Sequence, residues 1–411
     1  MPETIPQRWT YQVVVHRRNK RLDRLIDIAG IIWNHALALQ RRYHRLTGRY
    51  ISKYDMKAHL RKLRAGSPRF QYWQNVNSQA LADICGRLEQ AYEPYRKGAA
   101  KKPPKFRKVK QYKSFTLPIG NGCKLIESDN SKIGKLRLAF GWRGAEKMTV
   151  KYHIGGRPLP DKVNSVVIKR TGDGKFWLTF VVEAELTQTD YPSTGEVAGL
   201  DYMLQYLFMT DDGEIIDSPR FLSEELEEFR RLSRELSGHG RKIIGSGSRK
   251  RAKLALARHH SKIRNRRVDF HWKLGHAMCR QWDVLVAETL NFEEMKQQRG
   301  RGRIISDQAP AAFLRKLEWV AKKSGRLIVR AAWYFPSSKI CRGCGHKAAD
   351  MPPKRRVYEC AACGLVMDRD ENAARNLAQL GRGSAPGQSG GKAYLRNADS
   401  GAPASTAGPS V

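Results

Sequence analysis

Cys341-Arg-Gly-Cys344, fifteen further residues and then Cys360-Ala-Ala-Cys363 form the stretch that decides the fold of the C-terminal half. Two pairs of thiolates at this spacing predict one tetrahedral zinc ion between two knuckles, each followed by a glycine. Because four thiolates fill the coordination sphere and leave no position for water, we expect a structural zinc ion, not a catalytic one. His346 is then unnecessary as a ligand. Four free cysteines are the alternative, which the spacing disfavours.

Outside the cysteine segment, three acidic residues stand at positions where the local sequence does not favour an acid. Asp201 lies in the apolar run Val-Ala-Gly-Leu-Asp-Tyr-Met-Leu, Glu288 ends the strand-like Val-Leu-Val-Ala, and Asp370 begins a helix-like segment. Each alone has a structural explanation, as a carboxylate at a strand end or a helix N-cap. Two strands and a helix start can also bring three carboxylates to one point, where their repulsion calls for a cation. Mg²⁺ suits carboxylate oxygens, and two such ions about 4 Å apart would activate a water and stabilise the leaving 3′-oxygen of a phosphodiester.

The composition points to a polyanionic partner. The 411 residues include 76 Lys and Arg against 39 Asp and Glu, a formal net charge of +37. This charge favours nucleic acid as the partner and disfavours an ordinary metabolic enzyme. A hydrophobic content of 41% supports folded cores, in two to three domains at about 150 residues each. No apolar run approaches the ~18 residues of a membrane span and no secretory signal is evident, so we expect a cytoplasmic protein without a membrane partner.

The N-terminal half predicts a strand at residues 11–15 and then a helical segment. Apolar residues recur with a helical period from Leu22 to Gln40, and two more helices are expected at about 53–63 and 78–95. A plain three-helix module with a solvated basic face and a nucleic-acid surface both remain open. Short alternating runs between about 114 and 188 indicate a small antiparallel sheet or barrel, which the strand at 11–15 could join.

A basic strip, defined here as Lys101–Lys113, separates these two segments. Seven lysines and arginines alternate there with two prolines, Phe106 and Tyr112, so a continuous helix is excluded. We expect an extended segment that offers cations such as Lys105 and Arg107 to phosphates and aromatic rings to bases. A disordered basic linker is the alternative.

The C-terminal half predicts alternating strands and helices after a polar change near residues 187–196. Strands are expected at 197–201, 284–287 and 327–333, and a hairpin at 204–209 with its turn at 211–213. Helices are expected within 222–280, with a break at 245–248, and at 311–323 and 371–380. Residues 297–303, rich in Gly and Arg, are expected to form a flexible loop. The tail from Gly381 has few large apolar side chains and is expected to be disordered.

Several of these motifs together resemble the TnpB family of transposon-encoded RNA-guided nucleases, related to compact type V CRISPR effectors. The matching segments are Gly199-Leu-Asp-Tyr202, Val286-Ala-Glu-Thr-Leu290, Tyr334-Phe-Pro-Ser-Ser-Lys-Ile-Cys341 and Asp368-Arg-Asp-Glu-Asn-Ala-Ala-Arg-Asn-Leu377. Pro104-Lys-Phe-Arg107 with Ser114-Phe-Thr116 is similar to the family's N-terminal half. The resemblance covers about residues 10 to 380. Met203 departs from it, because many relatives have Gly two residues after the first Asp.

The resemblance implies a mixed α/β, multidomain protein with an RNase H-like (RuvC) nuclease domain and an inserted zinc ribbon. Its catalytic, Mg²⁺-binding carboxylates are Asp201, Glu288 and Asp370; Asp370 is preferred to Asp368 because the family's acid lies two positions before Asn372. The implied domains are a β-barrel-like domain (1–20 and 101–188), a helical recognition domain (21–100), the nuclease domain (189–335 and 366–380), the zinc ribbon (336–365) and a tail (381–411).

The resemblance also implies partners and alternatives. A guide RNA would associate with the basic surfaces and read the DNA target by base pairing, and the protein would read a short motif in the flanking duplex. Arg266 and Arg267 would contact phosphate, and the protein would associate with the nucleoid of a prokaryote; its oligomeric state stays open. A nuclease-inactive RNA-guided DNA-binding repressor and a strand-joining transposase are the alternatives. The zinc ribbon between the second and third acids disfavours the transposase.

Overall fold

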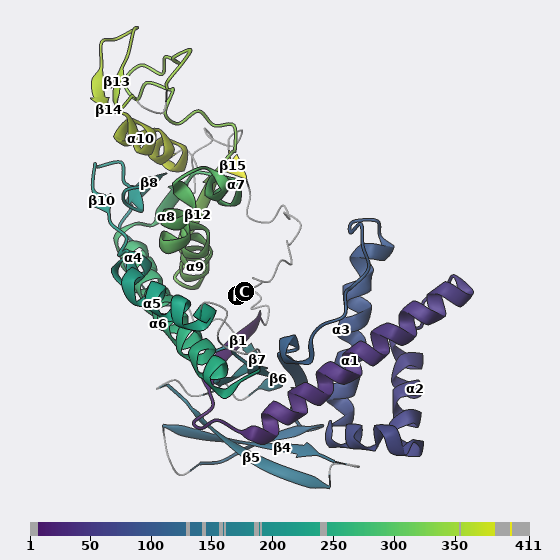
Figure 1. Cartoon of the computed structure of the whole chain (residues 1–411). Coiled ribbons are helices and arrows are strands. Elements are labelled where there is room, and N and C mark those ends of the chain that lie inside the picture. The colour runs from purple at the N-terminus through teal and green to yellow at the C-terminus, as the bar shows by residue number, and fades with distance from the viewer. Residues whose placement is uncertain are drawn as a thin grey trace, which may run out of the picture. The chain divides into compact units, whose positions relative to one another are not determined.

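The computed structural model describes residues 7–128, 132–141, 145–155, 159, 162–184, 189, 191–238, 245–352, 355–382 and 395–396. They divide into two compact units, Met1–Leu186 and Thr187–Val411, and the division falls at the polar change expected near residue 187. Figure 1 labels the elements of both units, which are taken in turn below. Within the described residues, no helix combines the length and the apolar character needed to cross a membrane.

Two antiparallel sheets form the β part of the first unit. One has the order β1 (Gln7–Val14), β7 (Phe176–Ala184), β6 (Val163–Arg170) and β2 (Ser114–Pro118). The other has the order β3 (Cys123–Ile126), β4 (Ile133–Phe140) and β5 (Glu146–His153). A bridge between Val15 and Tyr152 links them. Apolar residues alternate along β4 and β6 and fill one core. Because β1 pairs with β7, the first strand does join the predicted β segment.

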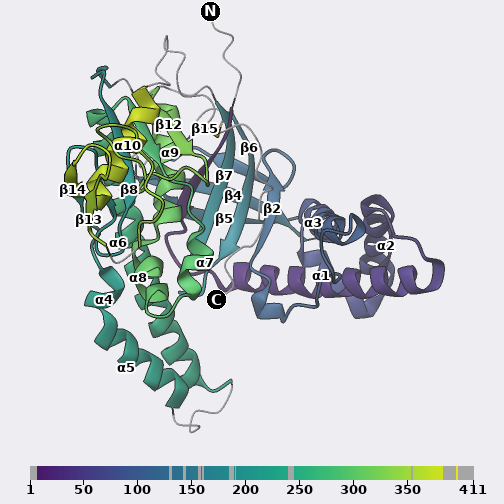
Figure 2. The same cartoon turned by 90° about the horizontal axis from the view of Figure 1, so that it is seen from above.

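Three α-helices follow β1, and Figure 2 shows them packed side by side. They are α1 (Lys20–Thr47), α2 (Lys53–Gly66) and α3 (Ser78–Arg96), with a short 3₁₀ helix, η1 (Pro68–Asn75), between the last two. Asn19, Ser52 and Asn77 each cap a helix N-terminus with a side-chain oxygen. The helical period predicted from Leu22 is therefore confirmed, and it extends seven residues past Gln40.

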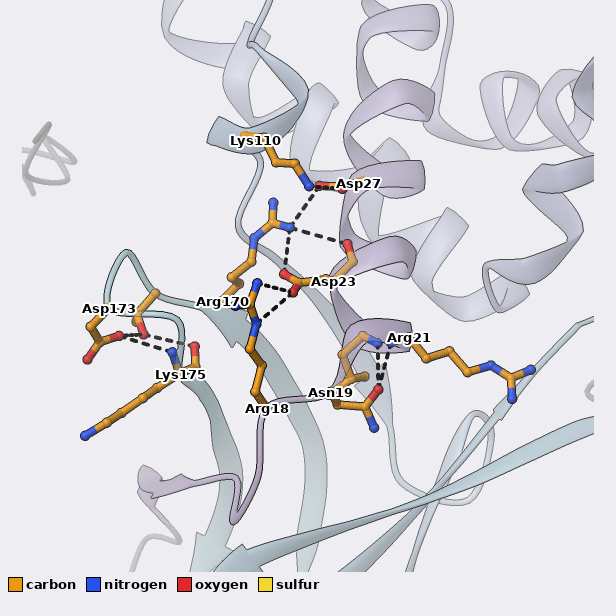
Figure 3. Close-up of polar contacts among 11 residues, drawn as sticks. Arg18, Asn19, Arg21, Asp23, Asp27, Lys110, Arg170, Asp173 and Lys175 are labelled. Carbon is orange, nitrogen blue, oxygen red and sulfur yellow. Dashed lines mark hydrogen bonds and ion pairs between the residues drawn. The ribbon is translucent and has the colours of Figure 1, made fainter. Parts of the chain in front are cut away.

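A network of ion pairs connects α1 to the sheet that contains β6 (Figure 3). The Arg170 side chain, 11% exposed at the end of β6, lies 3.1 Å from Asp23 and 2.9 Å from Asp27 on α1. It also donates to the main-chain carbonyl of Tyr112 at 3.1 Å, and Lys110 pairs with Asp27. One guanidinium thus joins β6, α1 and the end of the basic strip. Arg18 and Lys110, which also pair with Asp23 and Asp27, are largely exposed, so Arg170 is the buried partner of both acids and its loss should cost the most.

The basic strip is ordered against α1 and contains a single short 3₁₀ turn, η2 (Val109–Gln111). The Asn34 side chain exchanges hydrogen bonds of 2.7 and 3.0 Å with the main chain of Arg107. The guanidinium of Arg41 lies over the Phe106 ring, 4.7 Å from its centroid. The basic strip is therefore an ordered extended segment and not a disordered linker. Its lysines are exposed.

The second unit is organised by a six-stranded mixed sheet. Its order is β10 (Ile215–Ile216), β9 (Phe208–Met209), β8 (Val197–Tyr202), β11 (Val284–Ala287), β12 (Leu327–Ala331) and β15 (Leu395–Arg396). β8, β11 and β12 run parallel, whereas β9, β10 and β15 are antiparallel to their neighbours. The strand expected at 204–209 begins only at Phe208, and the turn at 211–213 joins it to β10, so the predicted hairpin is present. The tail expected to be disordered from Gly381 contributes residues 381–382 to a helix and Leu395–Arg396 to the sheet, and the rest of the tail lies outside the described residues.

Helices occupy most of the segments between these strands along the chain. They are α4 (Phe221–Glu224), α5 (Leu226–Ser237), α6 (Gly247–Gln281), α7 (Phe292–Gln297), α8 (Arg301–Gln308), α9 (Pro310–Lys323) and α10 (Arg369–Arg382). The prediction of a flexible loop at 297–303 is wrong for residues 301–303, which begin α8. Ile305 anchors this helix in the core, and Gly302 lets it pass the Lys296 carbonyl, which would lie 2.6 Å from an added Cβ.

Two glycines allow α10 to lie directly on the sheet. A Cβ at Gly199 of β8 would lie 1.9 Å from the Ala374 carbonyl oxygen, and one at Gly381 would lie 2.6 Å from the side chains of Val197 and Val286. Ala374 itself is fully buried. This close approach brings the start of α10 to the edge at which β8 and β11 end. The small hairpin of β13 (Val357–Glu359) and β14 (Val366–Asp368) directly precedes α10 (Figure 1).

Candidate active site and metal centre

The first two predicted acids are neighbours on adjacent parallel strands. Ala287 of β11 pairs with Leu200 of β8, so Glu288 and Asp201 come next at the same edge of the sheet. Asp201 is 8% exposed, and the two carboxyl groups share a hydrogen bond. Burial of a polar side chain is costly unless the side chain has a hydrogen-bond partner. Here the hydrogen bond between the two carboxyl groups offsets part of that cost.

The third acid comes from the first turn of α10. Asp368 accepts hydrogen bonds from the main-chain N–H groups of Asp370 at 2.8 Å and Glu371 at 3.1 Å, so it caps the helix. Asp370 is only 4% exposed and interacts electrostatically with Asp201 and Glu288. The cap explanation considered for Asp370 therefore applies to Asp368. The structure brings the three predicted carboxylates into one cluster.

Burial and mutual repulsion shift the acid strength of this cluster. Burial raises the pKa of Asp201 well above its usual value, and the charges of Glu288 and Asp370 raise it further. Burial also raises the pKa of Glu288, although hydrogen bonds from Ser337 and Asp201 oppose the shift. A pair of buried carboxyls with raised pKa values retains a proton that a bound cation would displace.

Two arginines hold the third acid. Arg356 lies 2.7 Å from one carboxylate oxygen of Asp370, and Arg369 lies 2.6 Å from the other. Among the described residues, the four cysteines are the only group of at least three His, Cys, Asp or Glu side chains whose ligand atoms all lie within 4.8 Å of one another. The three carboxylates therefore converge without closing to that spacing, and the guanidinium groups supply the positive charge beside Asp370.

The segment after β12 supports Glu288 from its other side. The Ser337 hydroxyl donates a hydrogen bond to the Glu288 carboxylate. Asn376 of α10 donates to the main-chain carbonyls of Ser337 at 2.8 Å and Ile340 at 2.7 Å, and Asn372 also donates to Ile340 at 2.7 Å. Both asparagines are buried. The Asn-Ala-Ala-Arg-Asn motif thus fixes the lead-in to the zinc ribbon beside the carboxylates.

The four cysteines form the cluster that their spacing predicted. Cys341 Sγ lies 3.6 Å from Cys363 Sγ, and Cys344 Sγ lies 3.5 Å from Cys360 Sγ. Tetrahedral Zn–S bonds of about 2.3 Å require sulfur atoms about 3.8 Å apart, so the cluster fits zinc. Main-chain N–H groups of Cys363 and Ala362 lower the pKa of the Cys360 thiol to about 6 and favour the thiolate that zinc requires. His346 is exposed and outside this group.

The predicted nucleic-acid contacts differ in how they are placed. Lys105 is exposed, and the Arg107 guanidinium lies 5.0 Å from the centre of the Trp33 ring. Arg266 pairs with Glu224 and Glu225, at 3.0 and 3.3 Å.

Arg267 donates to the main-chain carbonyls of Ser306 and Asp307, at 2.9 and 3.1 Å. It therefore holds the end of α8. Whether Lys105, Arg107, Arg266 or Arg267 contacts nucleic acid stays a prediction.

Met203, the departure from the expected first motif, lies just beyond β8. Its main-chain N–H donates to the Leu207 carbonyl at 3.3 Å. Among the described residues, Ala309 is the only non-glycine residue with a positive φ, so Met203 does not occupy a conformation that requires glycine. Gln308 holds the same loop by donating to the Leu204 carbonyl at 3.1 Å and accepting from the Tyr202 hydroxyl at 2.7 Å.

Sequence reasoning missed Ser337, Arg356, Arg369 and the two asparagines. Ser337 and the asparagines stand within motifs already singled out, so their positions carried a signal. Arg356 belongs to the loop between the two cysteine pairs, and its approach to Asp370 depends on how the ribbon folds back on α10.

Comparisons with known proteins confirm the resemblance to the TnpB family. The family OrfB_IS605, described as "Probable transposase", matches residues 179–299, and the family described as "Cas12f1-like, TNB domain" matches residues 311–377. A protein of Streptomyces pristinaespiralis named "Putative RNA-guided DNA endonuclease" is 32% identical over 60% of this chain and 61% of its own length. The "Putative RNA-guided DNA endonuclease InsQ" of Escherichia coli (strain K12) is 27% identical over 87% of this chain and 88% of its own.

Solved structures share the fold at low sequence identity. The chain in a Cas12f1-sgRNA-target DNA complex has a TM-score of 0.53 and 11% identity, and covers 91% of this chain and 99% of its own length. The mini-RNA-guided endonuclease CRISPR-Cas_phi3 has a TM-score of 0.52 and 10% identity, over 91% of this chain and 92% of its own. The mixed α/β, multidomain architecture is therefore shared with these proteins.

Proposed function

We propose that this chain is an RNA-guided DNA endonuclease of the TnpB kind. The carboxylates of Asp201, Glu288 and Asp370 would form the site that hydrolyses phosphodiester bonds of the target DNA. The convergence of these three acids, two of them buried, from the ends of two strands and the start of one helix is the observation that carries the proposal. The named relatives add that chains similar along most of this one are RNA-guided endonucleases by name.

The topology of the second unit supports an RNase H-like nuclease domain. Its antiparallel strands β10, β9 and β8 continue into the parallel strands β11 and β12, and a helix, α10, carries the last acid. The cysteine-containing segment lies between β12 and α10, which is where the resemblance places the zinc ribbon. We assign residues 189–335 and 366–380 to the nuclease domain and 336–365 to the ribbon. In the first unit, 1–20 with 101–188 and 21–100 correspond to the β-barrel-like and helical domains.

The residues at the carboxylate cluster fit divalent ions, Mg²⁺ above all. Carboxylate oxygens are the ligands that hard divalent cations prefer. Burial first, and repulsion between the acids second, raise the pKa values of Asp201 and Glu288, and a bound cation would relieve both effects. Two bound ions would supply the charge that activates a water and stabilises the leaving 3′-oxygen. Ser337 orients Glu288 from outside the cluster. Arg356 and Arg369 each contact one carboxylate oxygen of Asp370 and hold it near the other two acids. At least one of these contacts would have to break before that oxygen could bind an ion.

Guide RNA and double-stranded DNA with a short flanking motif are the proposed partners. The net charge of +37 supplies the attraction, and the ordered basic strip presents cations along α1. The fold shared with chains solved in complexes with guide RNA and target DNA supports the same partners.

Two alternatives stay open to experiment. An RNA-guided repressor without nuclease activity would need no carboxylate cluster, yet all three acids stand here and converge. A strand-joining transposase has support in the description of the family matched at 179–299.

The test is to purify the chain with its bound RNA, sequence that RNA, and supply matched double-stranded DNA with Mg²⁺. We expect a discrete RNA that ends in variable sequence, and cleavage of the matched DNA only. Binding without cutting would favour the repressor, and strand joining would favour the transposase.

A further inference from the structure

Two consecutive aromatic residues, Trp333 and Tyr334, stand exposed directly after β12. Their side chains are 73% and 55% exposed, and Trp333 is the most exposed of the large apolar side chains in the described residues. The two rings meet edge to face, with centroids 5.7 Å apart. Two adjacent exposed rings form an apolar platform, and its burial against a flat ligand would be favourable.

These rings belong to the same edge of the sheet as the carboxylates. Ala287 of β11 pairs with Arg330 of the parallel β12, so the two strands end together. Thr289 Oγ1 donates to the Ala331 carbonyl at 2.6 Å, and Ser337 donates to Glu288. The segment from 331 to 337 is therefore fixed at both ends beside the second acid.

Chain geometry limits how far the rings are from the cluster. Ser337 is the fourth residue after Trp333, so a fully extended chain places their Cα atoms at most about 14 Å apart. A strand in a duplex covers this distance in about four nucleotides, at roughly 3.4 Å each, and an extended single strand needs fewer. A strand with its scissile phosphate at the carboxylates could therefore reach Trp333 with a nearby base.

We propose that Trp333, supported at its edge by Tyr334, stacks on an unpaired base of the DNA strand that enters the carboxylate site. An indole face accepts any base, which suits an enzyme whose sequence selection would reside in base pairing elsewhere. The proposal rests on the proposed function, and it names single-stranded DNA as the form of substrate that this site takes.

The test measures binding of the full-length chain, after RNase treatment and in buffer without added Mg²⁺, to a fluorescent poly-dT oligonucleotide. We expect Trp333→Ala to weaken binding by about 5- to 150-fold, the range that loss of one stacked base gives. Trp333→Phe keeps a ring and should restore most of the affinity. Leu327→Ala, at the opposite end of β12 and 42% exposed, is the matched control and should bind as the wild type does.

Equal binding by Trp333→Ala and the wild type would overturn the proposal, as would an equal loss of affinity for fully duplex DNA. Because the ring is exposed, the melting temperature of Trp333→Ala should stay unchanged, which separates lost stacking from lost structure. The oligonucleotide readout needs neither guide nor cleavage. If the wild type fails to cut matched DNA but Trp333→Ala loses poly-dT binding, the proposed function falls and the stacking site stands; the converse pattern rejects the stacking site alone.

Discussion

Replacing Asp201 by asparagine should stabilise the chain when divalent ions are absent. The buried Asp201 lies beside Glu288, and Asp370 adds a further negative charge. Asparagine has nearly the shape of aspartate and can donate to Glu288 at any pH, so it keeps the hydrogen bond and avoids the cost of holding Asp201 either ionised or protonated in this site. A carboxylate cluster built to hold cations is thus expected to cost stability when they are removed.

The sign of the pH dependence follows from the raised pKa of Asp201. In the unfolded chain the group titrates at about pH 3.9. Its folded-state pKa is higher, so its stabilising contribution is present below the unfolded pKa and is lost as the pH rises through the folded pKa. Asp201→Asn has no carboxyl group at this position, so its free energy of unfolding does not fall in this way. The free energy of unfolding of the variant should therefore equal that of the wild type at low pH and exceed it increasingly as the pH rises toward neutrality.

The magnitude can be bracketed from Coulomb's law. Two unit charges about 4 Å apart repel by about 1 kcal/mol in water and about 4 kcal/mol at an effective dielectric constant of about 20. Relief in this range raises the melting temperature of a unit of this size by several degrees, at about 2–4 °C per kcal/mol.

Thermal unfolding in EDTA and in Mg²⁺, over a series of pH values, measures this difference. The wild type should gain stability from Mg²⁺, whereas Asp201→Asn should gain much less. Asp269→Asn is the control, because Asp269 is 64% exposed and paired with Lys273. A lower melting temperature for Asp201→Asn in EDTA at neutral pH, or an equal response of both proteins to Mg²⁺, would refute the reasoning.

Three further substitutions test the fold around the site. Cys341→Ser should release zinc, seen by metal analysis, and lower the melting temperature, because a closed thiolate site contributes folding energy; unchanged zinc content would contradict the ligand assignment. Arg170→Met should lower the free energy of unfolding by about 3 kcal/mol in denaturant titrations. Arg18→Met, which removes a 63% exposed partner at 3.1 Å from the same Asp23, should cost less than about 1 kcal/mol, and equal costs would reject the network as drawn. Gly199→Ala should destabilise by about 1–3 kcal/mol or more, since its Cβ would meet the Ala374 carbonyl; an unchanged unfolding free energy would show that α10 lies farther from β8.

Local patterns in the sequence predicted the parts of the site that depend on local structure. The cysteine spacing predicted the metal centre, because two knuckles form from short segments whatever surrounds them. Asp201 and Glu288 follow apolar runs that become adjacent parallel strands, so their meeting followed once both strands were recognised. In the structure Asp368 caps the helix and Asp370 lies with the other two acids, and the catalytic role of Asp370 stays a prediction.

The remaining features depend on contacts between distant segments. Ser337 reaches Glu288, and Arg356 reaches Asp370, only after the ribbon has folded against α10. The Gly- and Arg-rich composition of residues 297–303 indicated a loop, yet the burial of Ile305 makes α8 favourable from residue 301. The guanidinium groups of Arg266 and Arg267 have partners within the protein, and the phosphate contacts that the resemblance implies for them stay a prediction.

Cleavage of guide-matched duplex DNA by the single variants Asp201→Ala, Glu288→Ala and Asp370→Ala tests the central claim most directly. Each variant should lose cleavage in Mg²⁺ and still bind the DNA with its RNA. Asp368→Ala, two residues from Asp370 and confined to capping α10, should still cut. Retained cutting by any of the three variants, or loss of cutting only in Asp368→Ala, would contradict the assignment of these carboxylates as the nuclease site.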